Sequence, residues 1–302
     1  MKHVAVLMGG WSAEREVSLS SGRACAAALE RAGYKVTSMD VDRDVYETLK
    51  ALKPDAVFNA LHGKWGEDGC VQAILETLRI AYTHSGVLSS ALAMHKEKSK
   101  AVFRQAGLPV AESRLVALEE AAAAHPMSLP YVLKPVAEGS SVGVHIVLEG
   151  ANGPVSQILN ERHIFGDEVM VERFVPGQEL TCAVMKDEAL GVIDIVPTSG
   201  FYDYDAKYVP GGSRHILPAP IPAQVYGRVR EITVAAHKAL GCRGVSRSDF
   251  RYDPKSGDLI LLEVNTQPGM TGTSLVPELA AHAGHSLEAL VSWMVEDASL
   301  DR

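Results

Sequence analysis

The chain has 302 residues, of which 47% are hydrophobic, and its formal net charge is −8. This length and composition predict two or three domains with buried cores. The negative charge, without any block of lysines and arginines, excludes the basic surface that nucleic-acid binding requires. No apolar run approaches the roughly 20 residues of a membrane-spanning helix, so we expect neither nucleic acid nor a membrane as a partner.

The cysteines indicate a reducing compartment. Cys25, Cys70, Cys182 and Cys242 are scattered along the chain. They form no CxxC pair and have no histidine at zinc-like spacing, so we expect neither a disulfide framework nor a zinc site. The N-terminal HVAVLM is followed too soon by Gly-Gly to be a signal peptide. We therefore expect a cytoplasmic protein.

The first 86 residues alternate between strand-like and helix-like segments. HVAVLM, KVTSMDVD and DAVFNALHG have the pattern of strands, and apolar residues at helical spacing predict helices over residues 16–32 and around 71–78. This alternation predicts a Rossmann-like domain, residues 1–86, in which helices flank a parallel sheet. Ligands of such sheets bind beyond the carboxyl ends of the strands, which places Glu14 and His62 at one edge.

The rest of the chain has a different order of predicted helices and strands. Residues 86 to about 125 are expected to be helical, and PYVLKPV, VHIVL and EVMVERFV then predict an antiparallel sheet. We assign residues 87–176 to a central domain and 177–302 to a third, mixed α+β domain. The third includes a helix over about 222–240. The predicted fold class is therefore α/β and α+β in three domains.

Two strands near the C-terminus carry polar side chains that share a face. In SRSDFRY, Arg247 and Asp249 stand two residues apart, as do Glu263 and Asn265 in LILLEVN. Side chains at i and i+2 of a strand project from the same face. If the strands are neighbours, Asp249, Glu263 and Asn265 form an oxygen-only ligand set that suits Mg²⁺. The alternative is a salt-bridged sheet edge in which Asn265 caps a turn.

The segment KPVAEGSSVGV places Lys134 before a Gly-Ser-Ser-Val-Gly loop between two predicted strands. Backbone amides in such a loop, with no side chain at Gly139 or Gly143, can cradle phosphate oxygens. A plain hairpin turn is the alternative. Farther along, an adenine could lie against Phe174 and Val175, although such residues are more often simply core. The tyrosines of FYDYDAKY suggest a lid over the site.

Taken in order, several segments resemble the D-alanine:D-alanine ligase family of the ATP-grasp superfamily. They are MGGWSAEREVSL, ALHGKWGEDG, MHKEKSK, VLKPVAEGSSVGV, VERFVPGQELT, FYDYDAKY, SRSDF and LLEVNTQPGMTGTSLVP. The resemblance covers essentially the whole chain. It implies an ATP-grasp architecture in which ATP is held between the central and C-terminal domains. It also implies that two D-alanine molecules are joined through an acyl phosphate, with release of ADP and phosphate, for peptidoglycan precursor synthesis.

The resemblance also implies roles for individual residues. The ATP site would comprise Lys96 and Lys134 at the phosphates, Glu138, Ser140 and Ser141 in the loop that closes over them, and Glu172, Phe174, Val175 and Glu179 around the adenosine. Asp249, Glu263 and Asn265 would hold two Mg²⁺, for which Mn²⁺ could substitute. The substrate and catalytic set would comprise Glu14 at the ammonium group of the first D-alanine, His62 near its carboxylate, Arg247 and the Gly269 amide at the tetrahedral intermediate, Ser274 at the second carboxylate, and Lys207 and Tyr208 in the lid, with Tyr208 bonded to Glu14 and Ser140. A homodimer is a further family expectation.

Three positions depart from the family pattern. His95 stands where Asp is common, Ala137 where an Arg often precedes the glutamate, and Ser248 where an aliphatic residue is common. Two rival functions remain open: a ligase that accepts D-lactate as second substrate, against which DAKY counts, and a nucleotide-binding module without catalysis. Hydride transfer by a Rossmann domain is disfavoured because GGWSAE lacks the G-x-G-x-x-G spacing.

Overall fold

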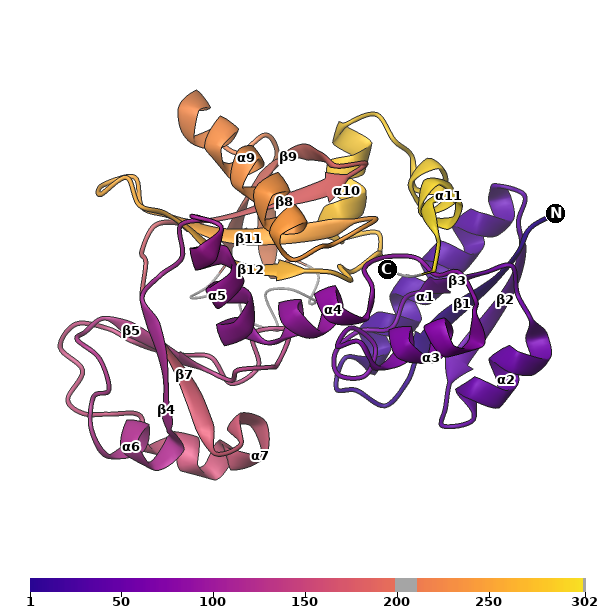
Figure 1. Ribbon diagram of the computed structural model, residues 1–302. Coiled ribbons are helices and arrows are strands. Elements are labelled where there is room, and N and C mark those ends of the chain that lie inside the picture. Colours follow the sequence, from indigo (N-terminus) through magenta and orange to yellow (C-terminus); the bar gives the residue numbers. More distant parts are fainter. Residues whose placement is uncertain (199–210, 301–302) are drawn as a thin grey trace.

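The computed structural model describes residues 1–198 and 211–300 (Figure 1). Its strands are β1 (His3–Gly9), β2 (Lys35–Val41), β3 (Ala56–Asn59), β4 (Ser113–Ala117), β5 (Tyr131–Lys134), β6 (His145–Val147), β7 (Glu168–Arg173), β8 (Gln178–Met185), β9 (Glu188–Pro197), β10 (Ser213–Ile216), β11 (Ser246–Tyr252) and β12 (Leu259–Asn265). Within the described residues they form three sheets, ordered β2-β1-β3, β4-β7-β5-β6 and β10-β9-β8-β11-β12. The first sheet is parallel, and the other two are antiparallel. The expected combination of α/β and α+β architecture is confirmed.

The parallel sheet is buried on both faces, as the uninterrupted apolar run of β1 predicts. Its surrounding helices are α1 (Arg15–Arg31), α2 (Val45–Leu52), α3 (Cys70–Leu78) and α11 (Leu287–Asp297). Val4 and Val6 pack on the side of α1 and α11, whereas Ala5 and Leu7 pack on the side of α2 and α3. The predicted helix over residues 16–32 occurs as α1. Because β1 and β3 are parallel neighbours, the loops after them open at the same edge, as expected.

The second sheet corrects one secondary-structure prediction. The predicted helix over residues 86–125 is interrupted by strand β4, which pairs with β7 at the edge of this sheet. Only Val116 of β4 is buried, so the sequence of this strand has little strand pattern. Its pairing with β7 determines its conformation. The helices of this part are α6 (Leu118–Ala123), η1 (Ser156–Glu161), a 3₁₀ helix, and α7 (Arg162–Phe165).

The third sheet separates a buried face from a face that carries polar side chains. Helix α9 (Ala223–Ala239) packs on one face, where Phe250 and Tyr252 of β11 meet Leu180 and Cys182 of β8. The opposite face packs Ala183 and other β8 and β9 residues against helix α10 (Leu275–His282). Along β11 and β12 the same opposite face carries charged side chains instead. This half of the sheet, left uncovered by α10, is where the candidate site lies.

Helices α4 (Val87–Met94) and α5 (Lys96–Gln105) bury their apolar side chains against the third sheet, although they precede the second sheet in sequence. Ala93 and Phe103 are buried in the core of the third sheet, together with residues of α9 and β12. The predicted central domain, residues 87–176, therefore contains two helices whose apolar residues are buried in the core of the third sheet. The division of the chain into domains stays a prediction. Across residues 1–198 and 211–300, no helix combines the length and the apolarity that crossing a membrane would demand.

Candidate active site

The polar side chains of β11 and β12 meet as the strand pattern predicted. Asp249 is the register partner of Glu263, and Arg247 is the register partner of Asn265. The four side chains therefore form a square on one face of the sheet, because cross-strand partners project from the same side. The intervening Ser248 is fully buried on the opposite face. Two adjacent antiparallel strands thus gather the predicted oxygen ligands.

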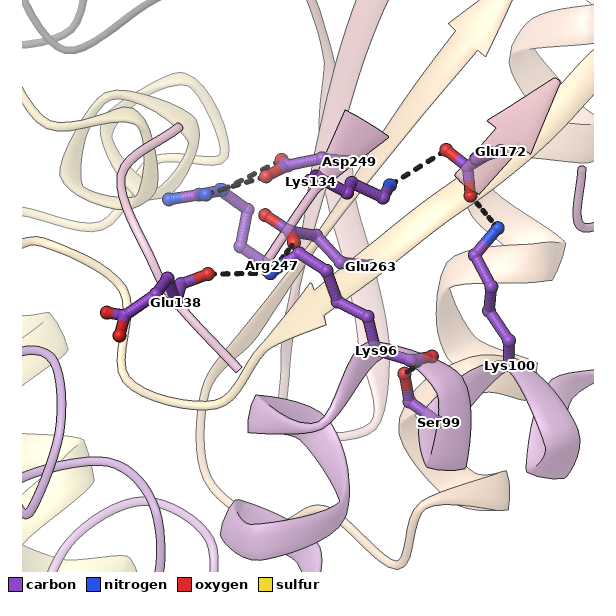
Figure 2. Close-up of polar contacts among 9 residues, drawn as sticks. All are labelled: Lys96, Ser99, Lys100, Lys134, Glu138, Glu172, Arg247, Asp249 and Glu263. Atoms are coloured by element: carbon purple, nitrogen blue, oxygen red, sulfur yellow. Dashed lines mark hydrogen bonds and ion pairs between the residues drawn. The ribbon is translucent and has the colours of Figure 1, made fainter. Parts of the chain in front are cut away.

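Each corner of the square is already bonded to a protein group. Arg247 donates from Nε to Asp249 Oδ1 (2.9 Å) and from Nη2 to Oδ2 (2.7 Å), and Lys96 Nζ lies 3.3 Å from Glu263 Oε2 (Figure 2). Asn265 Oδ1 accepts from the backbone N–H of Gln267 at 2.8 Å, so it caps the turn after β12. The contacts of the salt-bridged alternative are therefore present. Among the residues that the structure describes, no group of three or more His, Cys, Asp and Glu is placed to hold a metal.

The loop between β5 and β6 reaches across to the first domain. Ser140 Oγ donates to Glu14 Oε1, and Lys64 Nζ forms an ion pair with Glu138. Ser140 and Ser141 have φ angles of 52° and 58°, in the left-handed region that non-glycine residues rarely adopt. A Cβ at Gly139 would lie only 3.1 Å from Glu14 Oε2, so glycine permits this close approach. The hairpin is therefore held against the loop that follows β1.

The first of two adjoining hollows lies between the second and third sheets and is called the Lys134 hollow. It encloses about 840 Å³ of empty space, which includes its opening to solvent. Its lining includes Lys96, Lys134, Glu138, Ser141, Glu172, Phe174, Val175, Glu179, Asp249, Arg251 and Glu263. Apolar Val132, Val144 and Leu262 also line it, so it can enclose a flat apolar ring beside a charged end.

A buried ion-pair cluster lies at one wall of the Lys134 hollow. Glu172 Oε1 lies 2.7 Å from Lys134 Nζ, and its other oxygen pairs with Lys100 (Figure 2). Burial by itself would raise the pKa of Glu172, but the charges of Lys134 and Lys100 bring it below its ordinary value. Burial also lowers the pKa of the Lys100 ammonium to about 8, despite the opposing charge of Glu172. Glu172 is therefore an ionised acceptor inside an apolar wall.

The second hollow, called the Glu14 hollow, lies where the loops after β1 and β3 meet strands β11 and β12 and the loop between β5 and β6. It encloses about 990 Å³ of empty space, which includes its opening to solvent. Its lining includes Glu14, His62, Glu67, Lys96, Glu138, Ser140, Arg247, Glu263, Asn265, Gly269 and Ser274. Lys96, Glu138, Gly139 and Glu263 line both hollows. A Cβ at Gly269 would lie 2.9 Å from Ser274 Oγ, so a side chain there would displace Ser274. Because Lys96, Glu138, Gly139 and Glu263 line both hollows, two small molecules, one in each hollow, would meet at this shared wall.

His62 is buried, and its imidazole is hydrogen-bonded to helix α1. Its Nε2 lies 3.0 Å from Ser21 Oγ, and Ser21 Oγ also accepts from the backbone N–H of Met270 at 3.2 Å. Burial lowers the pKa of His62 to about 4, and the positive charge of Arg247 adds to this. The imidazole therefore connects the loop after β3 to helix α1 and to the loop that carries Gly269.

Comparison with known proteins identifies the family. A family model described as the D-ala D-ala ligase C-terminus matches residues 102–296, and one described as the D-ala D-ala ligase N-terminus matches residues 45–85. The D-alanine–D-alanine ligase of Parvibaculum lavamentivorans is 64% identical, over 100% of this chain and 99% of the relative. The chain belongs to the D-alanine–D-alanine ligase family.

Solved structures of this ligase family share the fold. A crystal structure of D-alanine–D-alanine ligase from Bacillus anthracis superposes with a TM-score of 0.83 at 31% identity, covering 98% of this chain and 97% of that chain. A structure of the ligase from the same organism complexed with ATP superposes with a TM-score of 0.82 at 29% identity, with coverage of 98% and 97%. The three-domain ATP-grasp architecture expected from the motifs is thereby confirmed.

The structure brings most of the predicted site residues of this ligase-family chain to one or both hollows. Lys207 and Tyr208 lie outside the described residues. Sequence reasoning missed Glu67, Lys100 and Arg251. Arg251 could have been found, because it lies two residues after Asp249 on the same strand face, where its Nη1 lies 3.3 Å from Glu179. Glu67 and Lys100 lie in quoted motifs, but no local pattern distinguishes them from surface charges.

The buried Glu67 is an acid whose charge is disfavoured. Its Oε1 accepts from the backbone N–H of Gly63 at 2.6 Å. Burial, and then the negative charge of Glu14, raise the pKa of Glu67 well above its ordinary value. In these surroundings the protonated form of the Glu67 carboxyl group is favoured.

Two departures from the family pattern have structural explanations. His95 is the N-cap of α5, where its Nδ1 accepts from the backbone N–H of Lys98 at 3.3 Å, so it fills the capping role that Asp often has. Ser248 faces away from both hollows and is fully buried. Ala137 provides no cation, and Lys64 of the first domain instead pairs with the neighbouring Glu138.

Proposed function

We propose that this chain catalyses the ATP-dependent ligation of two D-alanine molecules to D-alanyl-D-alanine, a peptidoglycan precursor, with release of ADP and phosphate. The observation that carries the proposal is the shared wall of the two hollows, formed by Lys96, Glu138, Gly139 and Glu263. A nucleotide in the Lys134 hollow directs its terminal phosphate toward that wall. An amino acid in the Glu14 hollow presents its carboxylate from the other side.

In the first step, a carboxylate oxygen of the first D-alanine attacks the γ-phosphorus of ATP. The bond from this phosphorus to the bridging oxygen of the β-phosphate breaks, which gives an acyl phosphate and ADP. Phosphoryl transfer depends mainly on positioning and on stabilisation of negative charge. Lys96 and Lys134 supply positive charge, the backbone amides around Ser140 and Ser141 cradle phosphate oxygens, and Glu14 binds the ammonium group of the amino acid.

In the second step, the amine of the second D-alanine attacks the acyl carbon, loses a proton and expels phosphate. Negative charge develops on the acyl oxygen, where the Arg247 guanidinium and the Gly269 amide stabilise it. Ser274 binds the carboxylate of the second D-alanine. Water must be excluded during this step because an exposed acyl phosphate would hydrolyse. The bond from Ser140 to Glu14 supports this closure by holding the hairpin over the site.

Asp249, Glu263 and Asn265 would hold two Mg²⁺ ions, or Mn²⁺ in their place. Their support is the hard oxygen donor set that the register of β11 and β12 assembles. Asp249 lines the Lys134 hollow, Asn265 lines the Glu14 hollow, and Glu263 lines both. Held by these residues, such ions would neutralise the negative charge of the phosphates during phosphoryl transfer. The two carboxylates leave positions for water and phosphate, as Mg²⁺ prefers.

Product analysis tests the proposal. The protein is incubated with ATP, Mg²⁺ and D-alanine, ADP release is followed by a coupled assay, and the products are resolved by mass spectrometry. We expect one D-alanyl-D-alanine per ADP, and no dipeptide when L-alanine replaces D-alanine. A second incubation with D-alanine plus D-lactate separates dipeptide from depsipeptide formation. Absence of both ADP and dipeptide would favour a nucleotide-binding module without catalysis.

The cellular setting follows from the substrates. Cytoplasmic ATP and reduced thiols suit a chain whose four cysteines, Cys25, Cys70, Cys182 and Cys242, are all free. We therefore place the reaction in the cytoplasm, which fractionation of cells that express a tagged chain would test. A homodimer stays a prediction, and sedimentation velocity would measure the assembly state directly.

A further inference from the structure

Lys100 is a fully buried charge that the proposed reaction does not use. It projects from helix α5, its side chain is 0% exposed, and it forms an ion pair with Glu172, which is 3% exposed on β7 (Figure 2). Glu172 also pairs with Lys134 at 2.7 Å. Removing a lysine from water is costly unless its charge is matched, so this position requires its partner.

The two lysines of this cluster have different access to the Lys134 hollow. Lys134 lines the hollow at the end of β5, where its ammonium can turn toward a phosphate. Lys100 lies behind Glu172 and does not line the hollow. When a nucleotide draws Lys134 toward its phosphates, Lys100 therefore remains as the counter-ion of Glu172. Without that counter-ion, a buried carboxylate would take up a proton or turn toward another donor.

The wall beside Glu172 suits a flat base. Val132, Val144, Phe174, Val175 and Leu262 provide apolar surface in the Lys134 hollow, and the ionised Glu172 belongs to the same lining. The other charged pair near Phe174 is Arg251 with Glu179, whose charges match each other. A carboxylate only accepts hydrogen bonds, so it favours a base that presents an amino group. A base that presents a carbonyl oxygen at the same position would place two acceptors face to face, which is unfavourable.

We propose that Lys100 is a positioning residue that selects the nucleotide base by holding Glu172 ionised and fixed in orientation. The chemical class that it favours is a purine with an amino group at position 6, over a purine with an oxo group there. This inference rests on the proposed use of ATP and deepens it. Lys100 contacts no substrate and acts through Glu172.

The test compares ATP with ITP, which differs by an oxo group in place of the 6-amino group. Steady-state kinetics at saturating D-alanine give kcat and KM for both nucleotides. We expect Lys100→Met to raise the KM for ATP about tenfold or more and to lower the preference for ATP over ITP, with kcat within about threefold. Lys100→Arg, which keeps the charge, should recover part of the preference.

Lys98→Met is the matched control, because Lys98 is exposed on the same helix. It should change neither KM nor the nucleotide preference. An unchanged preference in a folded Lys100→Met protein, or a fall in kcat with unchanged KM, would overturn the inference. Failure of the proposed function would be recognised separately, because the unmodified chain would then form no dipeptide.

A double variant covers the outcome in which Lys100→Met alone does not fold. Glu172→Gln combined with Lys100→Met removes both charges of the fully buried pair and leaves only Lys134, which lines the hollow. If Lys100 acts only through Glu172, the double variant should have the same ATP to ITP preference as Glu172→Gln alone. A further loss of preference in the double variant would show that Lys100 acts by another route.

Discussion

Asp249 and Glu263 face each other across strands β11 and β12, so two carboxylates that are 14 positions apart in the sequence become direct neighbours. Thr181 of β8 donates to Asp249 Oδ1 at 2.7 Å, which fixes this carboxylate further. Glu263 belongs to the wall that both hollows share, whereas Asp249 lines the Lys134 hollow alone. Negative charge is thus concentrated where the terminal phosphates of ATP are expected.

Glu263→Gln should reduce kcat by about a hundredfold or more while the fold remains intact. The change keeps the size of the side chain but removes a charged metal ligand, which is worth several kcal/mol of transition-state stabilisation. Dipeptide formation and a thermal melt measure the two effects. Glu231→Gln makes the same change in an exposed pair with Arg228 and should leave activity unaltered. Normal turnover by Glu263→Gln would rule out its metal role.

Ser140→Ala should raise the amount of phosphate released per dipeptide formed. The substitution removes the hydrogen bond to Glu14 that holds the hairpin against the first domain, so water gains access to the acyl phosphate. Parallel assays of phosphate and of D-alanyl-D-alanine provide the ratio. The closing role of this contact would be refuted by a ratio that stays at one while total turnover falls.

Lys64→Met should change the same ratio less than Ser140→Ala does. Lys64 also links the first domain to the hairpin, through Glu138, but its side chain is 59% exposed. Exposed ion pairs contribute only about 0.2–1 kcal/mol, which limits the expected change to about fivefold. The two variants assayed side by side, with salt varied, provide the comparison. A larger effect for Lys64→Met, insensitive to salt, would contradict this ranking.

His62 should make stability depend on pH between about 4 and 6.5. Its pKa is lowered to about 4 by burial, so in this range the unfolded chain binds a proton that the folded chain does not. Unfolding therefore becomes harder as the pH rises, by at most about 1.4 kcal/mol per pH unit. The difference in Tm between the unmodified chain and His62→Gln should grow from pH 4.5 to pH 6.5. A constant difference would mean that His62 is not buried in its neutral form.

Glu67 should make stability depend on pH in the direction opposite to that of His62. Its pKa is raised, so the folded chain keeps a proton that the unfolded chain loses as the pH rises above its ordinary value. Its contribution to stability is present at low pH and is lost as the pH rises toward its folded-state value. The Tm of Glu67→Gln relative to the unmodified chain should accordingly increase with pH. A decrease over pH 4.5–6.5 would show that Glu67 is ionised in the folded protein.

Local sequence patterns predicted much of the fold and the central part of the candidate site. Strand β1, helix α1 and the paired polar residues of β11 and β12 were predictable because periodicities of two and 3.6 residues report directly which faces are buried. Strand β4 was not predictable, since it is an edge strand whose conformation depends on its pairing with β7. Glu67 and Lys100 escaped notice for a related reason: their burial comes from segments distant in sequence.

The sequence by itself determined which residue types could perform the chemistry: Glu263 and Asn265 on one strand, and Arg247 and Asp249 on another. Only the tertiary structure decided that these strands are neighbours and that the two hollows share the wall containing Glu263. The physical reason is that side-chain direction is a local property of the backbone. Burial and cross-strand neighbours, by contrast, depend on chain segments that meet only when the whole chain folds.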